Sequence, residues 1–193
     1  MRLFIAIDLD EGSKRAAAAL GEDVARRLDS AGAADRRGVT WVSAHNLHLT
    51  LRFLGEVDEE RTRQVVARIG ERFQTPAFVL TLSELGVFPP AGPPRVVWIG
   101  AKGAGDSLAA LYREVESRLR GLQFEPESRP FQGHLTLGRF RKPAGRRARD
   151  LVRTEIPSPL IGPSRVDHVT LYRSDLSPRG PTYTPLVQAL LSG

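Results

Sequence analysis

Apolar residues recur at two spacings along the chain, and the spacing separates expected strands from expected helices. Alternation or a short apolar run predicts strands at residues 2–9, 39–42, 46–55, 78–87, 95–100, 129–140 and 166–172, with a short extended piece at 123–127. Helical spacing predicts helices at residues 13–28, 58–73, 106–119, 144–153 and 185–191. Residues 31–37, 88–94 and 173–181 are expected to be loops. Strands and helices therefore interleave in two similar series.

One tetrapeptide, His-Leu-Thr-Leu, occurs at residues 48–51 and again, letter for letter, at residues 134–137. Side chains alternate along a strand, so the histidine and threonine of each copy point to one face and the two leucines to the other. If each copy lies on a central strand of its own half, with the leucines packed on helices, two His/Thr pairs face each other across a cleft.

Chance does not account for this repeat. Random placement of the histidines and threonines would give roughly 0.2 His-x-Thr pairs in the chain, and the sequence has three. The third, His168-Val169-Thr170, indicates that part of the pattern reflects the alternation of polar and apolar residues in half-buried strands. The two identical copies therefore carry the functional interpretation.

The copies lie a little under half the chain apart, which suggests a duplication of one lobe related by a pseudo-two-fold axis. No linker separates the halves, so we expect one domain, residues 1–193. Apolar residues at 41% and charged residues at 26% are ordinary for a soluble globular protein. Since the chain has no cysteine, disulfides, thiolate metal sites and a cysteine nucleophile are excluded. With no signal peptide or membrane span expected, we predict a cytoplasmic protein.

The net charge of +6 favours a polyanionic partner, although richness in arginine is also a compositional habit of some sources. The densest basic stretch, residues 139–149, either contacts the phosphates of a nucleic acid or forms a solvated basic face. Trp98 is a candidate for stacking on a base, with a core or rim position as the alternative, and Phe4 lines either the cleft or the core.

Two facing His/Thr pairs suit an in-line displacement at phosphorus. One neutral imidazole accepts a proton from water while the other, protonated, donates one to the leaving alkoxide. The hydroxyls of Thr50 and Thr136 would hold the non-bridging oxygens. Arg52 lies two residues past Thr50, so alternation places it on the His48 face as a phosphate ligand, or else as an exposed arginine at the strand end. No metal, P-loop or serine-elbow motif is present, so we expect no metal and no cofactor.

Both tetrapeptides and their flanks resemble those of the two-histidine (2H) phosphoesterases. Within that superfamily the chain is most similar to the bacterial and archaeal RNA 2′,3′-cyclic phosphodiesterases, historically called 2′-5′ RNA ligases. The matching stretches are Arg-Leu-Phe-Ile-Ala-Ile at the start, Asn-Leu-His-Leu-Thr-Leu-Arg-Phe-Leu-Gly-Glu-Val, Pro-Arg-Val-Val-Trp, Arg-Pro-Phe-Gln-Gly-His-Leu-Thr-Leu-Gly-Arg and Leu-Tyr-Arg-Ser-Asp-Leu. The resemblance implies a bilobal α+β fold, with two pseudo-symmetric lobes of antiparallel sheet and outer helices around a V-shaped cleft.

The resemblance also implies the reaction, the hydrolysis of an RNA-terminal 2′,3′-cyclic phosphate to a 2′-phosphate without metal, by a monomer. It assigns His134 as general base, His48 as general acid and Thr50 and Thr136 as phosphate ligands. Arg139 matches a phosphate-binding arginine five residues after the second histidine, but alternation alone puts it on the leucine face, so this role requires a bulge, a strand end or strong twist. His45 and His168 match no catalytic position and are expected outside the site.

Three alternatives stay open. In the first, the substrate is a small cyclic nucleotide or an ADP-ribose cyclic phosphate. In the second, the enzyme mainly runs the reverse 2′-5′ ligation. In the third, the chain is a non-catalytic RNA-binding module. Both His/Thr pairs are intact, which argues against the last.

Overall fold

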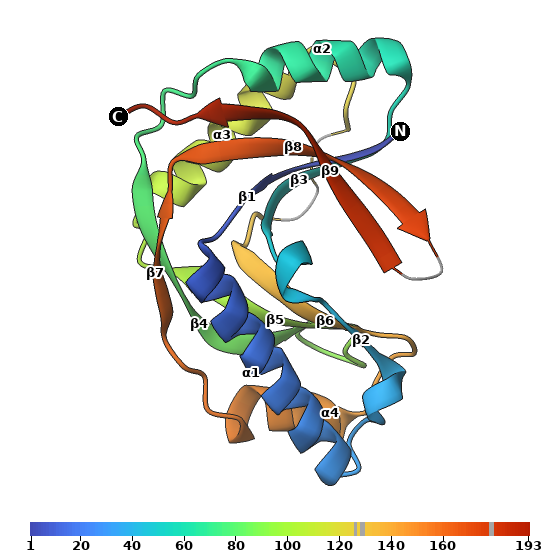
Figure 1. Ribbon diagram of the computed structural model, residues 1–193. Helices are drawn as coiled ribbons and strands as arrows, with labels where there is room; N and C mark the ends of the chain where they lie inside the picture. The colour runs from blue at the N-terminus through green and yellow to red at the C-terminus, as the bar shows by residue number, and fades with distance from the viewer. Residues whose placement is uncertain (126, 128–129, 178–179) are drawn as a thin grey trace.

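The protein folds as a curved antiparallel sheet with helices packed against it (Figure 1). The computed structural model describes residues 1–125, 127, 130–177 and 180–193. The strands are β1 (Arg2–Ile7), β2 (Val39–Trp41), β3 (Leu49–Glu56), β4 (Phe78–Phe88), β5 (Val96–Lys102), β6 (His134–Phe140), β7 (Ile161–Val166), β8 (His168–Ser177) and β9 (Gly180–Leu190). The helices are α1 (Glu11–Ser30), α2 (Glu59–Gly70), α3 (Ser107–Leu119) and α4 (Arg146–Asp150), the last continuing as a π-helical turn over Leu151–Glu155. This is the α+β class expected from the sequence.

The strand order places the two motif strands side by side in the middle of the sheet. The order is β7-β4-β5-β6-β3-β1-β8-β9, with β2 pairing additionally with β6. β3 and β6 share one pair of opposed residues, Leu49 and Leu135. The sheet therefore divides into two halves of four strands each, β3-β1-β8-β9 and β6-β5-β4-β7, which correspond to the two expected lobes.

Two of the helices cross from the half that supplies them to the other half. Helix α1 follows β1 but packs against β6 and β7, whereas α3 follows β5 but packs against β3 and α2 (Figure 1). α2 covers β8 and β9. Because each half is covered by a helix that emerges from the other, the halves are interlocked.

The apolar faces of the strands and helices form a core that runs under both halves. Leu49 and Leu135 are fully buried at its centre, as are Ile5 of β1 and Ile99 of β5. The leucine face of each tetrapeptide thus points into the core, and the histidine face is left to the concave side of the sheet. Helix α1 begins where the side chain of Asp10 accepts a hydrogen bond from the backbone N–H of Ser13, a standard N-cap.

Several expected elements differ from the observed ones, chiefly at the C-terminus. The helix expected at residues 185–191 is wrong, because Gly180–Leu190 forms β9 and pairs with β8 along its whole length. The loop expected at 173–181 is largely strand, since β8 continues to Ser177. A two-turn helix is marginal by itself, and cross-strand pairing outweighs it. Strand β7 was not expected, because Gly162, Pro163 and Ser164 are typical of a turn.

Two expected segments fall partly outside the described residues. Residues 123–125 and 127 form no strand, and residue 126 of the expected extended piece is not described. In the second motif region the strand begins at His134, and residue 129 of the expected range is not described.

The pairing of Leu49 with Leu135 at the centre of the core gives a stability prediction. Leu49→Ala or Leu135→Ala should lower the free energy of unfolding by about 2–5 kcal/mol, since each leaves a cavity at a fully buried position. Urea unfolding followed by circular dichroism measures this. Leu176→Ala, at a leucine that is 66% exposed, is the matched control and should change stability by no more than about 0.5 kcal/mol.

Candidate active site

The two motif histidines have matching backbone anchors. Nδ1 of His48 lies 2.8 Å from the carbonyl oxygen of Asn46, and Nδ1 of His134 lies 2.8 Å from that of Gln132. A carbonyl oxygen only accepts, so each Nδ1 carries the hydrogen and donates it. In both neutral rings this leaves Nε2 with a lone pair, available to take up a proton.

The hydroxyl partners follow from the central strand pair. Because Leu49 lies opposite Leu135 in an antiparallel register, the flanking positions bring Thr136 toward His48 and Thr50 toward His134. Each histidine therefore has a threonine of its own motif on the same strand and the threonine of the other motif across the strand boundary. The sequence predicted this convergence of four side chains, and the structure brings them together on one face.

Both motif strands carry a β-bulge at the same place. In β3 the register with β1 shifts between Thr50 and Arg52, so Leu51 is the extra residue. In β6 the register with β5 shifts between Thr136 and Gly138, so Leu137 is the extra residue. A bulge reverses the alternation beyond it. The fifth residue after each histidine, rather than the fourth, therefore returns to the histidine face.

This bulge corrects the expectation for Arg52. The residue lies on the leucine face, 5% exposed, with its Nε 3.2 Å from Glu116 and its Nη1 2.7 Å from Glu127. It also donates to the backbone carbonyl of Glu125. Arg52 does not share the His48 face and is not placed to hold a phosphate there. Simple alternation failed because it did not include the extra residue, Leu51.

Arg139, unlike Arg52, lies on the histidine face of the sheet. It is the fifth residue after His134, exposed, and on the histidine face as a result of the bulge at Leu137. Burial lowers the pKa values of His48 and His134, and the positive charge of Arg139 adds to this effect, so its guanidinium lies within electrostatic reach of both histidines. The corresponding residue of the first motif is Phe53, which is 51% exposed.

Aromatic rings hold both imidazoles. Phe4 stacks on His48 with ring centroids 4.7 Å apart, and Tyr183 meets the same imidazole edge-on at 5.1 Å. Around His134, the ring of Phe88 lies edge-on at 5.0 Å and Trp98 lies at 6.1 Å. Phe4 is thus both a core residue and a support for the site.

Trp98 packs beside His134 because β4 leaves room for it. A Cβ on Gly86 would lie 2.2 Å from the indole of Trp98, so only glycine fits at that position. Trp98 also stacks on Phe88 at 5.0 Å. Its contacts are those of a residue that orients His134.

Burial disfavours the protonated form of both motif histidines. Burial lowers the pKa of His48 to about 4, against the opposing effects of the Asn46 carbonyl and the Asp8 carboxylate. Burial also lowers the pKa of His134, and the charge of Arg139 adds to this. A bound phosphate would neutralise Arg139 and favour the protonated imidazoles.

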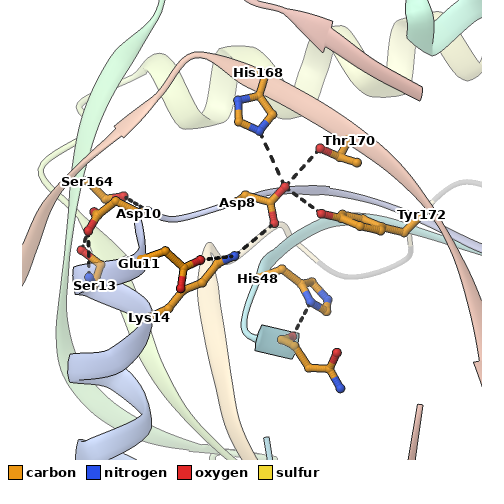
Figure 2. Close-up of polar contacts among 11 residues, drawn as sticks. Asp8, Asp10, Glu11, Ser13, Lys14, His48, Ser164, His168, Thr170 and Tyr172 are labelled. Carbon is orange, nitrogen blue, oxygen red and sulfur yellow. Dashed lines mark hydrogen bonds and ion pairs between the residues drawn. The ribbon is translucent and has the colours of Figure 1, made fainter. Parts of the chain in front are cut away.

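The third His-x-Thr pair lies outside this group, on the far side of Asp8 (Figure 2). Nε2 of His168 is 3.7 Å from Asp8 and its Nδ1 is 2.7 Å from Asp167. Contact with Asp8, and then with Asp167, raises the pKa of His168 to about 9, so this ring is charged at neutral pH. His45 lies in the turn before His48, where its ring is 3.3 Å from Ser43.

The basic stretch at 139–149 is only partly free to bind a polyanion. On and beside α4, Arg147 pairs with Glu155, and Arg146 and Arg149 pair with Asp150. Arg139, Arg141 and Lys142 are exposed, and within the part of the chain that the structure describes they form no ion pair. The cationic positions left for phosphates therefore lie at the end of β6.

Two other features bear on the site. Among the described residues, no three or more histidine, aspartate or glutamate side chains are grouped so that they could hold a metal ion. No helix in the described ranges is long and apolar enough to cross a membrane.

Comparison with known proteins places this chain among the phosphoesterases. The family model described as LigT-like phosphoesterase matches residues 10–98 and again residues 99–183, with one His-Leu-Thr-Leu copy in each stretch. The chain belongs to the LigT-like phosphoesterase family. Two successive matches of one model agree with the internal repeat seen in the sequence.

Individual LigT-like relatives cover the chain from end to end. An RNA 2′,3′-cyclic phosphodiesterase of Thermotoga maritima is 34% identical over 196 aligned positions, covering 100% of this chain and 97% of that protein. A crystal structure of a Thermus thermophilus protein superposes with a TM-score of 0.76 at 33% identity, covering 100% of this chain and 99% of that one. Escherichia coli LigT, complexed with 3′-AMP, gives a TM-score of 0.70 at 30% identity, covering 100% and 98%.

Sequence reasoning missed several residues of this LigT-like site. Tyr183 was missed because it lies between the expected loop and the expected helix, where no strand was predicted, and Asp8 follows β1 with no pattern that marks it. Tyr172 continues the alternation of His168 and Thr170 along β8, and this spacing is the signal that could have placed it on the same face. Phe53 reaches the histidine face only through the bulge, which no local signal indicates.

The ion pair between His168 and Asp8 gives a pH-dependent stability prediction. Because the pKa of His168 is raised from 6.5 to about 9, its charged form stabilises the fold fully below about pH 6.5, and this contribution is lost as the pH rises through about 9. His168→Gln should therefore lower the free energy of unfolding near pH 6 by on the order of 1–2 kcal/mol, allowing for a side chain that is 30% exposed. The difference from wild type should close by about pH 10 in urea titrations. A constant difference across this range would contradict the ion-pair account.

Proposed function

We propose that the protein hydrolyses the 2′,3′-cyclic phosphate at the end of an RNA to a 2′-phosphomonoester without a metal ion. The observation that carries this is the convergence of His48, Thr50, His134 and Thr136 on one face of the sheet about a single strand pair. The named relatives are RNA 2′,3′-cyclic phosphodiesterases, which supports the same reaction class.

In the proposed reaction, water attacks phosphorus from the side of His134 and O3′ leaves on the side of His48. Nε2 of His134 takes a proton from the water as the new P–O bond forms, and Nε2 of His48 gives its proton to O3′ as the P–O3′ bond breaks. The backbone anchors of the two rings are alike, so this division of roles follows the family resemblance.

Thr50, Thr136 and Arg139 would hold the non-bridging oxygens. The two hydroxyls lie on the histidine face, and a guanidinium fork matches two phosphate oxygens. The anionic phosphate would offset the charge of Arg139, which lowers both histidine pKa values in the empty site. Substrate binding itself would therefore promote protonation of His48.

RNA is the proposed substrate for a chemical reason. A 2′,3′-cyclic phosphate forms only where a 2′-hydroxyl exists, so an enzyme specific for this group acts on ribonucleotide ends. The exposed Arg139, Arg141 and Lys142 would attract upstream phosphates.

We further propose that the protein acts as a cytoplasmic monomer with a single domain of residues 1–193. Both motifs come from one chain, the two halves share one sheet, and helices cross between the halves. The absence of cysteine fits a reducing compartment.

The direct test is incubation with an RNA oligonucleotide ending in a 2′,3′-cyclic phosphate, in excess EDTA, with the product followed by phosphorus NMR. We expect conversion to a 2′-phosphomonoester at a rate that EDTA does not change. A 3′-phosphate product would contradict the proposed direction of bond breakage. Turnover of small cyclic nucleotides but not of the oligonucleotide would favour the small-molecule alternative, and binding without turnover would favour a binding module.

Substitution of the two histidines separates catalysis from binding. His48→Ala and His134→Ala should each lower kcat by about 10³-fold or more, since each removes a proton-transfer group, and should leave the circular dichroism spectrum and much of the substrate affinity intact. Thr50→Val and Thr136→Val should each lower kcat by about 10²-fold. His168→Ala should cost no more than about tenfold. Greater loss from His168→Ala than from either motif histidine would overturn this choice of catalytic pair.

A further inference from the structure

The third His-x-Thr pair has a structural partner, the carboxylate of Asp8 at the end of β1. Side chains of His168, Thr170 and Tyr172 project from one face of β8 and converge on Asp8 Oδ2, at 3.7, 3.1 and 2.8 Å respectively (Figure 2). On the other oxygen, Nζ of Lys14 lies 3.8 Å from Oδ1. Asp8 is thus contacted by three alternate residues of β8 and by one lysine of α1.

The same carboxylate lies next to the first catalytic histidine. Asp8 and His48 line one cavity of about 270 Å³, and Asp8 is the only acid among the described residues of its wall. Figure 2 shows Asp8 between the three side chains of β8 and the imidazole of His48. The charged group that shifts the pKa of His134 is, by contrast, Arg139, and no carboxylate among the described residues has such an effect.

The charged and titratable groups around His48 come from every neighbouring element. Asp8 of β1 favours the protonated imidazole, and Lys14 of α1 and Arg139 of β6 disfavour it. The phenols of Tyr172 on β8 and Tyr183 on β9 remain neutral, because burial raises their pKa values. His45 of the preceding turn lines the same cavity. Asp8 therefore supplies the negative charge in a setting that is otherwise positive or neutral.

We propose that Asp8 is a positioning residue of the active site: held by the third His-x-Thr pair, its carboxylate stabilises the protonated form of His48. The inference rests on the proposed function, in which His48 donates a proton to the leaving oxygen. Burial holds the imidazole of His48 neutral, so an acid at this position requires a nearby anion.

The contacts around Asp8 keep its carboxylate ionised. Burial by itself would raise the pKa of Asp8, but His168, Tyr172, Lys14 and Thr170 together lower it below its ordinary value, so the carboxylate stays ionised at neutral pH. His168 is charged as well. The net field at His48 is therefore set by a negative group and by positive groups close to it, and removing either kind should act in opposite directions.

The opposite effects of negative and positive groups on the pKa of His48 provide the test. The imidazole pKa values of His48 and His134 are measured by NMR on protein with labelled histidines, in saturating inorganic phosphate, whose charge raises both values. Asp8→Asn keeps the shape of the side chain and removes its charge, and should lower the pKa of His48 by at least about half a unit. Lys14→Gln removes a positive charge that disfavours the protonated imidazole of His48 and should raise its pKa. His134 is the internal control, and its pKa should change by less than that of His48 in either variant.

Kinetics give a second readout. At pH 7, Asp8→Asn should lower kcat/KM for a cyclic-phosphate RNA by about three- to tenfold, which corresponds to half a pKa unit to one unit of lost protonation, and lowering the pH should recover part of the loss. Asp175→Asn, on the exposed end of β8, is the matched control and should leave both the pKa of His48 and the rate unchanged.

Shifts of His48 in the same direction in Asp8→Asn and Lys14→Gln, or equal shifts of His48 and His134, would overturn the proposal and leave Asp8 a structural residue. If Asp8→Asn does not fold, Lys14→Gln is measured alone and should raise the pKa of His48 more than that of His134. Opposed shifts in a protein that turns over no cyclic phosphate would instead refute the proposed function, so the two failures are distinguishable.

Discussion

The active site depends on one antiparallel contact, the pairing of Leu49 with Leu135 where the two motif strands meet. Both leucines are fully buried, so the contact is fixed by the core rather than by the polar groups above it. Alternation along the strands then determines which side chains appear on the concave face. The positions of four polar residues are thus set by apolar packing on the opposite side of the sheet.

The bulges show how much local sequence can and cannot specify. Alternation correctly placed His48, Thr50, His134 and Thr136, because these residues precede the extra residue in each strand. It failed for Arg52, which lies just beyond it. A bulge arises from how two strands pair, and that pairing joins residues far apart in the sequence. For Arg139 periodicity alone predicted the leucine face, and only the family resemblance pointed to the histidine face, which the register shift at Leu137 allows.

The C-terminal hairpin illustrates the same limit on a larger scale. Residues 185–191 have spacing compatible with a short helix, yet they form the end of β9, since β8 offers a complete row of backbone partners. Tyr183 reaches His48 through this hairpin. This residue was missed because no strand was predicted at residues 180–190, whereas the long helices α1, α2 and α3, with strong periodicity, were located within a few residues of their observed ends.

The exchange of helices between the two halves of the sheet makes the fold indivisible. Helix α1 leaves β1 to cover strands of the other half, and α3 makes the reciprocal crossing. Neither half of the sheet would keep its full helical cover if the other were removed. The two motif strands are therefore held together by these helices as well as by their own pairing.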